Sequence, residues 1–303
     1  MPAIMSFSEL TEHLQKISVS KRLAVVNPTD SQTMEAIIKA SKAGMISPVI
    51  IGNPVDFNMQ ALRLQTDFEF VACNDLTQAS ALAVEMVKTG AADILMKGLV
   101  NTDVILHAIL DKEKGIVSYG NVVTFIAAME SPHYSKLLFV TDPAVIPAPT
   151  LRQRIAMIHY AISMAKNFGI QKPKVALIHG TEKMNLRLCY MPDYQKILEL
   201  EKAGEFGDAI VAGPLDLFLA LDKELGKIKN IPSPILGDAD VVVFPGFESA
   251  NIFYKTMITF GQAQMGGILF GTDKPVVLTS RSDSAESKFN SIALACLKHI
   301  TDI

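Results

Sequence analysis

Short runs of apolar residues alternate along this chain with longer segments in which apolar positions recur at helical spacing. Leu23–Val26 is the first such run, and Asp30 follows it at a position suited to capping a helix. That helix is predicted to run through Lys42 and to end at Gly44. Because each run is continuous and bounded by turn residues, it is typical of a strand in a parallel sheet covered on both faces.

The same alternation repeats through the first part of the chain. Further strands are predicted at Pro48–Ile51, Phe68–Ala72 and Asp93–Met96. Helices are predicted over Asp75–Thr89 and Asn101–Leu110, each opened by a capping residue. Repeated β-α alternation of this kind indicates a doubly wound α/β fold.

A proline-rich segment interrupts the series. The strand predicted at Lys136–Thr141 leads into Asp142–Pro149, which holds three prolines within seven residues. Prolines at this density predict a stiff, extended connector and a domain boundary. A long helix is then predicted over Thr150–Asn167.

The alternation resumes after that helix. Four strands are predicted, at Lys174–Ile178, Ala209–Val211, Asp240–Phe244 and Gly267–Phe270. The last unit is a strand over Pro275–Ser280 followed by a helix over Ser284–His299. At roughly 150 residues per domain, the 303 residues predict about two α/β domains.

Composition narrows the class of protein. The 28 basic and 31 acidic residues give a net charge of −3, which offers no basic field for nucleic acid or for an anionic membrane. Hydrophobic residues make up 49% and charged residues 19%, which predicts a large buried core and a buried subunit interface. No run of about 20 apolar residues is present to cross a membrane.

Compartment is indicated by the N-terminus and the cysteines. Residues 1–15 include Glu9, Glu12 and His13 where a signal peptide needs a long apolar run. The three cysteines are widely spaced and form no CxxC pair, which fits neither a disulfide framework nor a zinc site. We therefore expect a soluble, cytoplasmic protein.

Polar residues follow the last predicted strand directly. Ser280 and Arg281 come at its end and lead into a helix N-terminus. Ligands bind beyond the carboxyl ends of strands in open α/β sheets, and a helix N-terminus favours an anion. Arg281 adds a planar fork that can hold phosphate or carboxylate at two points. The alternative is structural: Ser282 or Ser284 caps the helix while Arg281 pairs with Asp283 or Glu286.

A second unit of the same form follows the strand Asp93–Met96. Lys97 ends that strand, Gly98 permits close backbone approach, and Asn101 or Thr102 opens a helix. A lysine on this edge can neutralise a phosphoryl group, whereas the alternative is a solvated lysine beside an ordinary helix cap. No GxGxxG, GxxxxGK[ST], GxSxG or HExxH motif points to another chemistry.

Taken in order, these motifs resemble those of the phosphate acetyltransferase/phosphate butyryltransferase family. The resemblance rests on Met96–Asp103, Val140–Asp142, Gly213–Leu215, Asp238–Pro245, Glu248–Asn251 with Tyr254-Lys255, Thr279–Ser284 and Asn290–Ala295. It implies reversible transfer of an acyl group between CoA and phosphate in a direct ternary complex. It also implies that CoA is a substrate and that neither a metal nor a permanently bound cofactor takes part.

The resemblance also implies an architecture. Two doubly wound domains would enclose a cleft, as in isocitrate/isopropylmalate dehydrogenase-like folds, and the C-terminal segment would return to the first domain. The first domain is then residues 1–142 plus 272–303 and the second is residues 143–271. A homodimer or a higher homo-oligomer is expected, with contacts through the second domain.

Site residues are carried over position by position. Arg281 would hold the acyl-phosphate anion, Ser280 would bond the carbonyl or thiolate region, and Lys97 would contact phosphate. Asn101, Thr102 and Asn251 are the further candidate phosphate or acyl contacts. Glu248 and Asn251 open a helix, and an acidic residue in a first helical turn is also explained by its favourable interaction with the helix dipole alone.

The length, Lys97 and the Thr279–Ser284 form look more like the butyryltransferase branch, and the sequence departs from the acetyltransferase branch at two positions. The counterpart of the aspartate proposed as thiol base in that branch falls at or beside Ser287 here, so Glu286 or Asp283 becomes the candidate base. An arginine of that branch aligns near Ile258, which removes one cationic contact and fits a longer or branched acyl chain.

Other functions remain open at this point. Phosphate acetyltransferase with acetyl-CoA is the first alternative. A β-decarboxylating dehydrogenase would need an aspartate cluster for a divalent metal, and no matching cluster is visible in the sequence. A non-catalytic, anion-binding paralogue or two-lobed binding protein is the last.

Overall fold

The computed structural model describes residues 2–18, 20–63 and 65–297. The chain forms two compact units. One, the split unit, is built from Phe7–Val123 and the chain from Met265 on; the other, the middle unit, is Thr124–Gln264 with the N-terminal residues up to Ser6. Both divisions lie N-terminal to the boundaries predicted after residues 142 and 271.

The split unit is organised around parallel strands. Their order is β3 (Glu69–Ala72), β2 (Ile46–Gly52), β1 (Lys21–Val26), β4 (Ile94–Lys97) and β11 (Val276–Val277), followed by β10 (Gln264–Phe270). The first five are mutually parallel and β10 runs antiparallel to β11. The carboxyl ends of β1, β4 and β11 therefore lie together at one edge.

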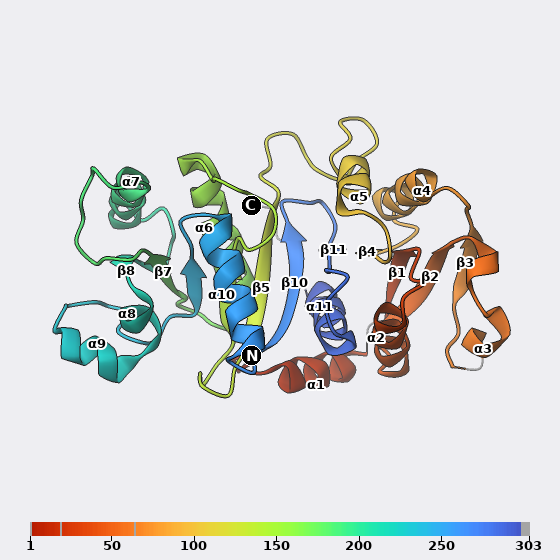
Figure 1. Cartoon of the computed structure of the whole chain (residues 1–303), viewed down its shortest axis with the longest axis horizontal. Helices are drawn as coiled ribbons and strands as arrows, with labels where there is room; N and C mark the ends of the chain where they lie inside the picture. The colour runs from red at the N-terminus through yellow and green to blue at the C-terminus, as the bar shows by residue number, and fades with distance from the viewer. Residues whose placement is uncertain (1, 19, 64, 298–303) are drawn as a thin grey trace. The chain divides into compact units, whose positions relative to one another are not determined.

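Helices cover both faces of this sheet (Figure 1). On one face α11 (Ala285–Leu297) packs between α1 (Phe7–Ile17) and α2 (Ser31–Lys42). On the other lie α4 (Leu76–Lys88) and α5 (Thr102–Ile109), while the short η1 (Pro54–Asp56) and α3 (Met59–Arg63) connect β2 with β3. The predicted end of the last helix at His299 lies outside the described residues.

Two of the predicted helix caps in the split unit are confirmed. The Asp30 carboxylate accepts the Thr33 backbone N–H at the start of α2, and Asp75 accepts the Gln78 N–H at the start of α4. An aspartate here satisfies a helix N–H and places negative charge at the positive end of the helix dipole.

The middle unit has its own sheet. Its strand order is β5 (Thr124–Glu130), β6 (Leu138–Thr141), β9 (Val241–Val243), β7 (Lys174–Ile178) and β8 (Ile210–Leu215). All neighbouring pairs are parallel except β5 with β6. The helices are α6 (Leu151–Asn167), α7 (Met191–Lys202), α8 (Leu217–Leu221), α9 (Lys223–Lys229) and α10 (Phe247–Thr259).

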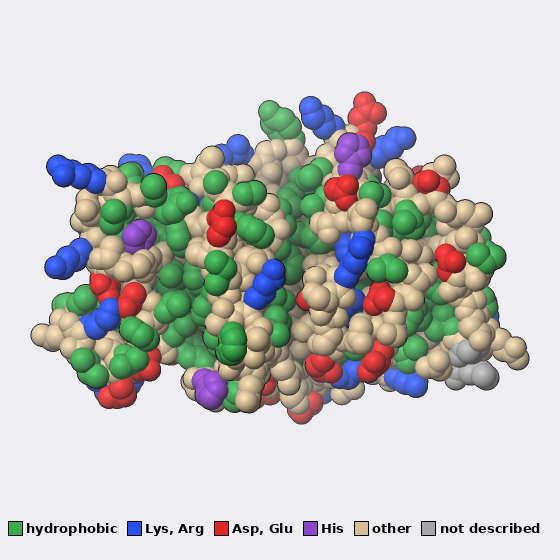
Figure 2. All heavy atoms as spheres, viewed as in Figure 1, with side chains coloured by type: hydrophobic (Ala, Val, Ile, Leu, Met, Phe, Trp, Pro, Cys, Tyr) green, Lys and Arg blue, Asp and Glu red, His purple; other side chains and the backbone are tan. Residues whose placement is uncertain are grey.

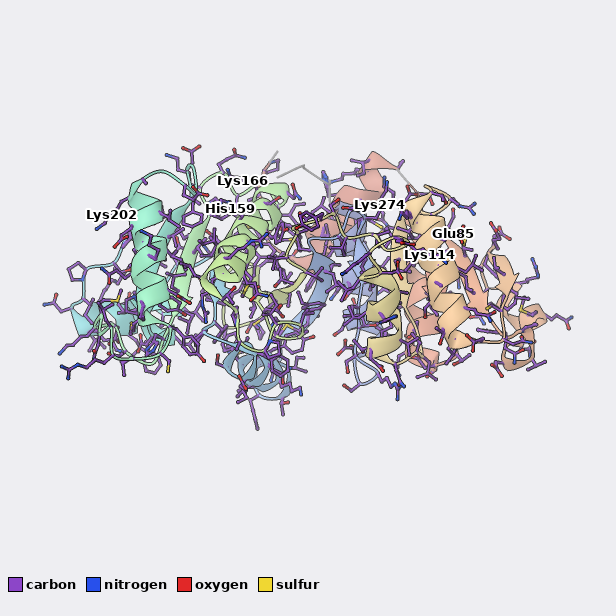
Figure 3. The ribbon with its side chains drawn as sticks, turned by 90° about the horizontal axis from the view of Figure 1, so that it is seen from above. Glu85, Lys114, His159, Lys166, Lys202 and Lys274 are labelled. Carbon is purple, nitrogen blue, oxygen red and sulfur yellow. The ribbon has the colours of Figure 1, made fainter. Side chains whose placement is uncertain are left out.

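These helices also lie on both faces of their sheet. Helices α6 and α7 cover one face, marked in Figure 3 by His159, Lys166 and Lys202, and α8 and α10 lie across the sheet from them. Helix α6 begins with a capping box, in which the Thr150 side chain accepts the Gln153 N–H and the Gln153 side chain accepts the Thr150 N–H.

The proline-rich segment is folded, whereas the sequence predicted an extended connector. The buried Asp142 carboxylate accepts the N–H groups of Ala144, Val145 and Ile146, which turns the chain back on itself. The same carboxylate accepts the Thr124 hydroxyl at 2.7 Å and so joins the ends of β6 and β5. This strand pair explains why the compact unit begins at Thr124, ahead of the prolines.

Acidic and basic side chains are interspersed over the face seen in Figure 2. This distribution agrees with the small net charge of −3. In the described part of the chain, no helix is both long and apolar enough to span a membrane.

Candidate anion-binding site

Three neighbouring strands of the split unit bring the predicted phosphate-binding residues together. Val26 of β1 pairs with Lys97 of β4, and Met96 of β4 pairs with Val277 of β11. Because the strands are parallel, Lys97 and the Ser280-Arg281 pair that follows β11 emerge at the same edge. The two sequence units separated by about 180 residues therefore form one site.

Lys97 is buried, with only 3% of its surface exposed. Its ammonium donates a hydrogen bond to the Thr279 carbonyl oxygen at 3.1 Å. Burial lowers the pKa of Lys97, and the nearby positive charges of Arg281 and Lys288 lower it further. The alternative of a solvated surface lysine is thus excluded by the structure.

Gly98 lets the loop after β4 pass close to the end of β1. A Cβ at this position would lie 2.4 Å from the Val26 carbonyl oxygen, a contact that no side chain can make. The Leu99 N–H donates to the Asn27 carbonyl, and the Asn27 side-chain amide donates to the Leu99 carbonyl. The close approach that Gly98 allows is therefore to neighbouring backbone, and it fixes the loop that leads to Asn101.

Asn101 pairs with Arg281 instead of capping its own helix. The Arg281 guanidinium donates a hydrogen bond to the Asn101 side-chain oxygen, and no side chain of the described residues caps the start of α5. The first N–H groups of α5 are consequently left available to a ligand, at the positive end of the helix dipole. Arg281 pairs with neither Asp283 nor Glu286, which were its predicted structural partners.

The N-terminus of α11 is less open than the sequence suggested. The Gln32 side chain accepts the Ala285 N–H at 2.9 Å, and the Ser284 hydroxyl accepts the Ser287 N–H at 3.1 Å. Ser284 thus caps this helix, as one of the sequence alternatives proposed. The helix that offers free N–H groups to an anion is α5, and α11 supplies the turn that carries Arg281.

A pocket of about 310 Å³ joins these groups. Its lining is Lys97, Val100, Asn101, Thr102, Asp103, Ser280 and Arg281. Two cations and a helix N-terminus thus face a space near the lower end of the range for small-molecule sites, which is roughly 300 Å³. The arrangement can hold a compact anion such as phosphate.

The two candidate bases occupy different surroundings. The Asp283 carboxylate accepts the Ser280 backbone N–H at 2.8 Å, and burial raises the pKa of Asp283. Glu286 is exposed and forms an ion pair with Lys39 of α2. The residues that line the pocket include neither carboxylate.

Lys288 is a charged residue that the sequence reasoning missed. It lies inside α11, is 1% exposed, and donates hydrogen bonds to Asp30 and Thr33 at the start of α2. A charged residue on the buried face of a helix is rare unless it is paired, and Lys288 stands next to the apolar Phe289 at such a face. That placement is the sequence signal that could have found it.

Asn251 belongs to the middle unit, where it lies in the first half of α10. Its side-chain amide donates a hydrogen bond to the Pro143 carbonyl at 2.9 Å, so it anchors the folded proline segment. Within the described residues, no group of three His, Cys, Asp or Glu side chains is placed to hold a metal ion.

A larger hollow of about 650 Å³ lies between α4 and α5, where Glu85 and Lys114 both contribute to its wall (Figure 3). Its charged lining mixes Glu85, Asp111 and Glu113 with Lys88 and Lys114. Because the three acids outnumber the two lysines, this hollow does not favour an anion, whereas in the smaller pocket Lys97 and Arg281 outnumber Asp103.

Residues 71–296 match the family model described as phosphate acetyl/butaryl transferase. The chain belongs to this family. It is 36% identical over 297 residues to the phosphate butyryltransferase of Clostridium acetobutylicum, covering 97% of this chain and 98% of that protein. The family resemblance and the acyltransferase class of enzyme predicted from the sequence are therefore confirmed.

Solved structures agree with this family assignment. A branched-chain phosphotransacylase from Enterococcus faecalis matches with a TM-score of 0.79 and 30% identity over 91% of this chain and 98% of that chain. A 4-hydroxythreonine-4-phosphate dehydrogenase from Klebsiella pneumoniae matches at a TM-score of 0.54 and 12% identity over 92% of this chain and 100% of that chain. The second similarity concerns the fold alone, and it confirms the predicted dehydrogenase-like α/β fold class.

Proposed function

We propose that this enzyme transfers a short-chain acyl group, butyryl or similar, reversibly between CoA and inorganic phosphate. The observation that carries the proposal is the convergence of Lys97, Arg281 and the uncapped start of α5 on one pocket. Direct transfer to phosphate requires that the phosphate be held in one position and that its negative charge be neutralised. These groups supply both.

The phosphate is the nucleophile in the forward direction. One of its oxygens attacks the thioester carbonyl carbon, the C–S bond breaks, and CoA leaves as a thiolate that takes up a proton. Arg281 binds the phosphate through its planar fork, which Asn101 orients. Lys97, held by the Thr279 carbonyl, places a second positive charge beside the anion in a poorly solvated position. Ser280 is the hydroxyl donor for the thioester region.

Of the two candidate bases, we assign a positioning role to Asp283 and no role to Glu286. Asp283 holds the Ser280 N–H and thereby shapes the turn that lines the pocket. Glu286 is committed to Lys39 on the surface. In the reverse direction the thiol must lose its proton, and since a thiol pKa is about 8.5, a weak base suffices for that step.

The butyryl reading is supported by the relative named phosphate butyryltransferase and by the structure named as a branched-chain phosphotransacylase. Acetyl transfer is the alternative, because the family description covers both acyl groups. We further propose that CoA is a substrate, that no cofactor is bound permanently, and that the enzyme works in the cytoplasm as a homo-oligomer. Three unpaired cysteines and the exposed Ile252 and Phe260 of the middle unit support the last two points.

The test is release of thiol from acetyl-, propionyl-, butyryl- and isobutyryl-CoA, each with and without inorganic phosphate. Phosphate-dependent release is expected, with the highest kcat/KM for the four-carbon chains. The Arg281→Ala variant should lose about 2–4 kcal/mol of transition-state stabilisation, and Arg281→Lys should recover part of it because it keeps the charge without the fork. Near-normal phosphate-dependent turnover in Arg281→Ala would overturn the proposal, and a preference for acetyl-CoA would select the alternative.

A further inference from the structure

Among the described residues that line the anion pocket, Asp103 is the one carboxylate. It lies in the first turn of α5, the helix whose start carries no side-chain cap. A negative charge in the wall of a pocket weakens the binding of any anion there, because like charges repel. The place of Asp103 in this pocket therefore needs a reason.

The helix dipole supplies only part of that reason. An acidic residue in a first turn interacts favourably with the positive end of the helix. At the starts of α2 and α4, Asp30 and Asp75 do more, since each carboxylate also accepts a backbone N–H. Within the described part of the chain, Asp103 forms neither a hydrogen bond nor an ion pair. Its oxygens are therefore available to a ligand in the pocket.

The rest of the pocket offers mainly hydrogen-bond donors. The Lys97 and Arg281 side chains can only donate, as can the first backbone N–H groups of α5. The Asn101 oxygen already accepts a hydrogen bond from Arg281, and the Ser280 hydroxyl is bonded to a neighbouring serine. Among these lining residues Asp103 alone has a side chain that can only accept.

Many donors and a single carboxylate distinguish oxyanions by whether they carry a hydrogen. Near neutral pH inorganic phosphate is present as hydrogen phosphate and dihydrogen phosphate, and both have a hydroxyl group on phosphorus. Sulfate is tetrahedral as well but is fully deprotonated. A phosphate hydroxyl donates to a carboxylate, whereas a sulfate oxygen beside it brings together two acceptors and two negative charges.

We propose that Asp103 is a specificity-determining residue: its carboxylate accepts the hydroxyl hydrogen of inorganic phosphate and so excludes sulfate, which has no such hydrogen. The inference rests on the proposed function, which makes phosphate the anion of this pocket. Lys97, Arg281 and the N–H groups of α5 then bind the unprotonated oxygens, one of which attacks the thioester.

The exposure of Asp103 limits the size of the effect. An enclosed site built to bond a substrate hydroxyl rejects the analogue without it by roughly 10⁴–10⁵-fold, because its polar groups are left unpaired. Water reaches Asp103, so the carboxylate stays solvated when sulfate is bound. We therefore expect Asp103 to contribute about tenfold to the preference for phosphate over sulfate.

The first experiment measures the dissociation constants of phosphate, arsenate and sulfate by calorimetry near neutral pH and at constant ionic strength. Wild type should bind phosphate and arsenate, which both carry a hydrogen at this pH, more tightly than sulfate. In Asp103→Asn the ratio of the sulfate to the phosphate dissociation constant should fall about tenfold. Sulfate should gain most, because the asparagine amide is uncharged and can donate to a sulfate oxygen.

Three further variants control this measurement. Glu9→Gln is the matched control, because Glu9 is the acidic residue in the first turn of α1 and lines no part of the pocket. Its ratio should equal that of wild type. Asp103→Glu keeps the charge and should keep part of the preference for phosphate. Asp103→Ser is a second neutral variant that suits a helix start, and its ratio should fall as in Asp103→Asn.

Binding needs no turnover, so it separates this inference from the proposed function. A wild type without phosphate-dependent thiol release, but with a preference for phosphate that depends on Asp103, would defeat the proposed function and leave the specificity role standing. If Asp103 serves the helix dipole alone, both neutral variants will be less stable and their ratios will equal that of wild type. That result would overturn the inference, even with acyl transfer intact.

Discussion

The guanidinium of Arg281 donates a hydrogen bond to the side-chain oxygen of Asn101, 180 residues away in the sequence. Asn101 precedes α5 and Arg281 precedes α11, so the bond ties together the loops after two neighbouring strands. It also diverts Asn101 from its own helix, whose first N–H groups stay uncapped. One hydrogen bond thus orients the cation and opens the helix terminus.

Asn101→Ala is expected to weaken phosphate binding more than it slows the chemical step. Losing the acceptor frees Arg281 to adopt other rotamers, so KM for phosphate should rise roughly three- to tenfold while kcat changes little. Steady-state kinetics at saturating butyryl-CoA provide the measurement.

A double-mutant cycle tests whether Asn101 acts through Arg281. Combining Asn101→Ala with Arg281→Ala should add little to the effect of Arg281→Ala alone, because the partner is already gone. Asn53→Ala serves as the control, since Asn53 caps the short η1 helix and lines no part of the pocket. Fully additive effects at Asn101 and Arg281 would show that the two side chains act independently.

The parts of this structure that follow local rules were predictable from the sequence. Strands β1, β4 and β6 contain the apolar runs Leu23–Val26, Ile94–Met96 and Leu138–Val140, and Asp30 and Asp75 cap helices as expected. The joining of Lys97 and Arg281 at one edge also follows, since parallel strands share their carboxyl ends.

Features set by long-range contacts were not predictable in the same way. Strand β5 was missed although Phe125–Met129 is an apolar run like the others. The proline segment was read as extended, because its fold depends on the buried carboxylate of Asp142. Its bonds join residues on two strands, and no local pattern reports them. Asp142 was noted only as part of a family motif, with no role of its own.

The site shows the same division. The local sequence pattern predicted Asn101 as a helix cap, yet its side-chain oxygen accepts a hydrogen bond from Arg281, which precedes a different helix. Glu286 is close in sequence to the position expected for a thiol base, but its place on α11 directs its side chain to Lys39 on α2. Lys288 went unnoticed because its partners, Asp30 and Thr33, lie more than 250 residues earlier.

Replacing Asp283 should change the pH–rate profile, whereas replacing Glu286 should not. Glu286→Gln removes an exposed ion pair, which is worth little, and should leave the pH–rate profile unchanged. Asp283→Asn keeps an oxygen that accepts the Ser280 N–H but cannot ionise. It should therefore abolish the part of the fall in kcat/KM at low pH that protonation of Asp283 causes.

The measurement is kcat/KM for phosphate between about pH 5 and pH 9 for both variants, divided by the wild-type value at each pH. For Asp283→Asn this ratio should rise toward low pH, because wild type loses its carboxylate there and the variant does not. A flattened profile in Glu286→Gln instead would return the base role to Glu286.

Lys97→Met should separate stability from activity. Because burial and two neighbouring cations lower the pKa of Lys97, the folded state holds its charged form at a cost that the unfolded chain does not bear. Methionine has a similar length and no charge, so the free energy of unfolding should rise by about 1 kcal/mol near neutral pH. Phosphate-dependent turnover should fall by at least an order of magnitude, since one of two cations in the pocket is lost.

The pH dependence gives that prediction its sign. Below the lowered folded-state pKa, Lys97 is charged in both states and the wild type carries the full cost of burial. As pH rises from that value toward the ordinary 10.5, the folded state releases its proton first and the cost disappears. Urea unfolding of wild type and Lys97→Met at several pH values should therefore show a stability gap that narrows in alkali. A variant less stable than wild type at neutral pH would mean that the bond to the Thr279 carbonyl outweighs the cost of burying the charge.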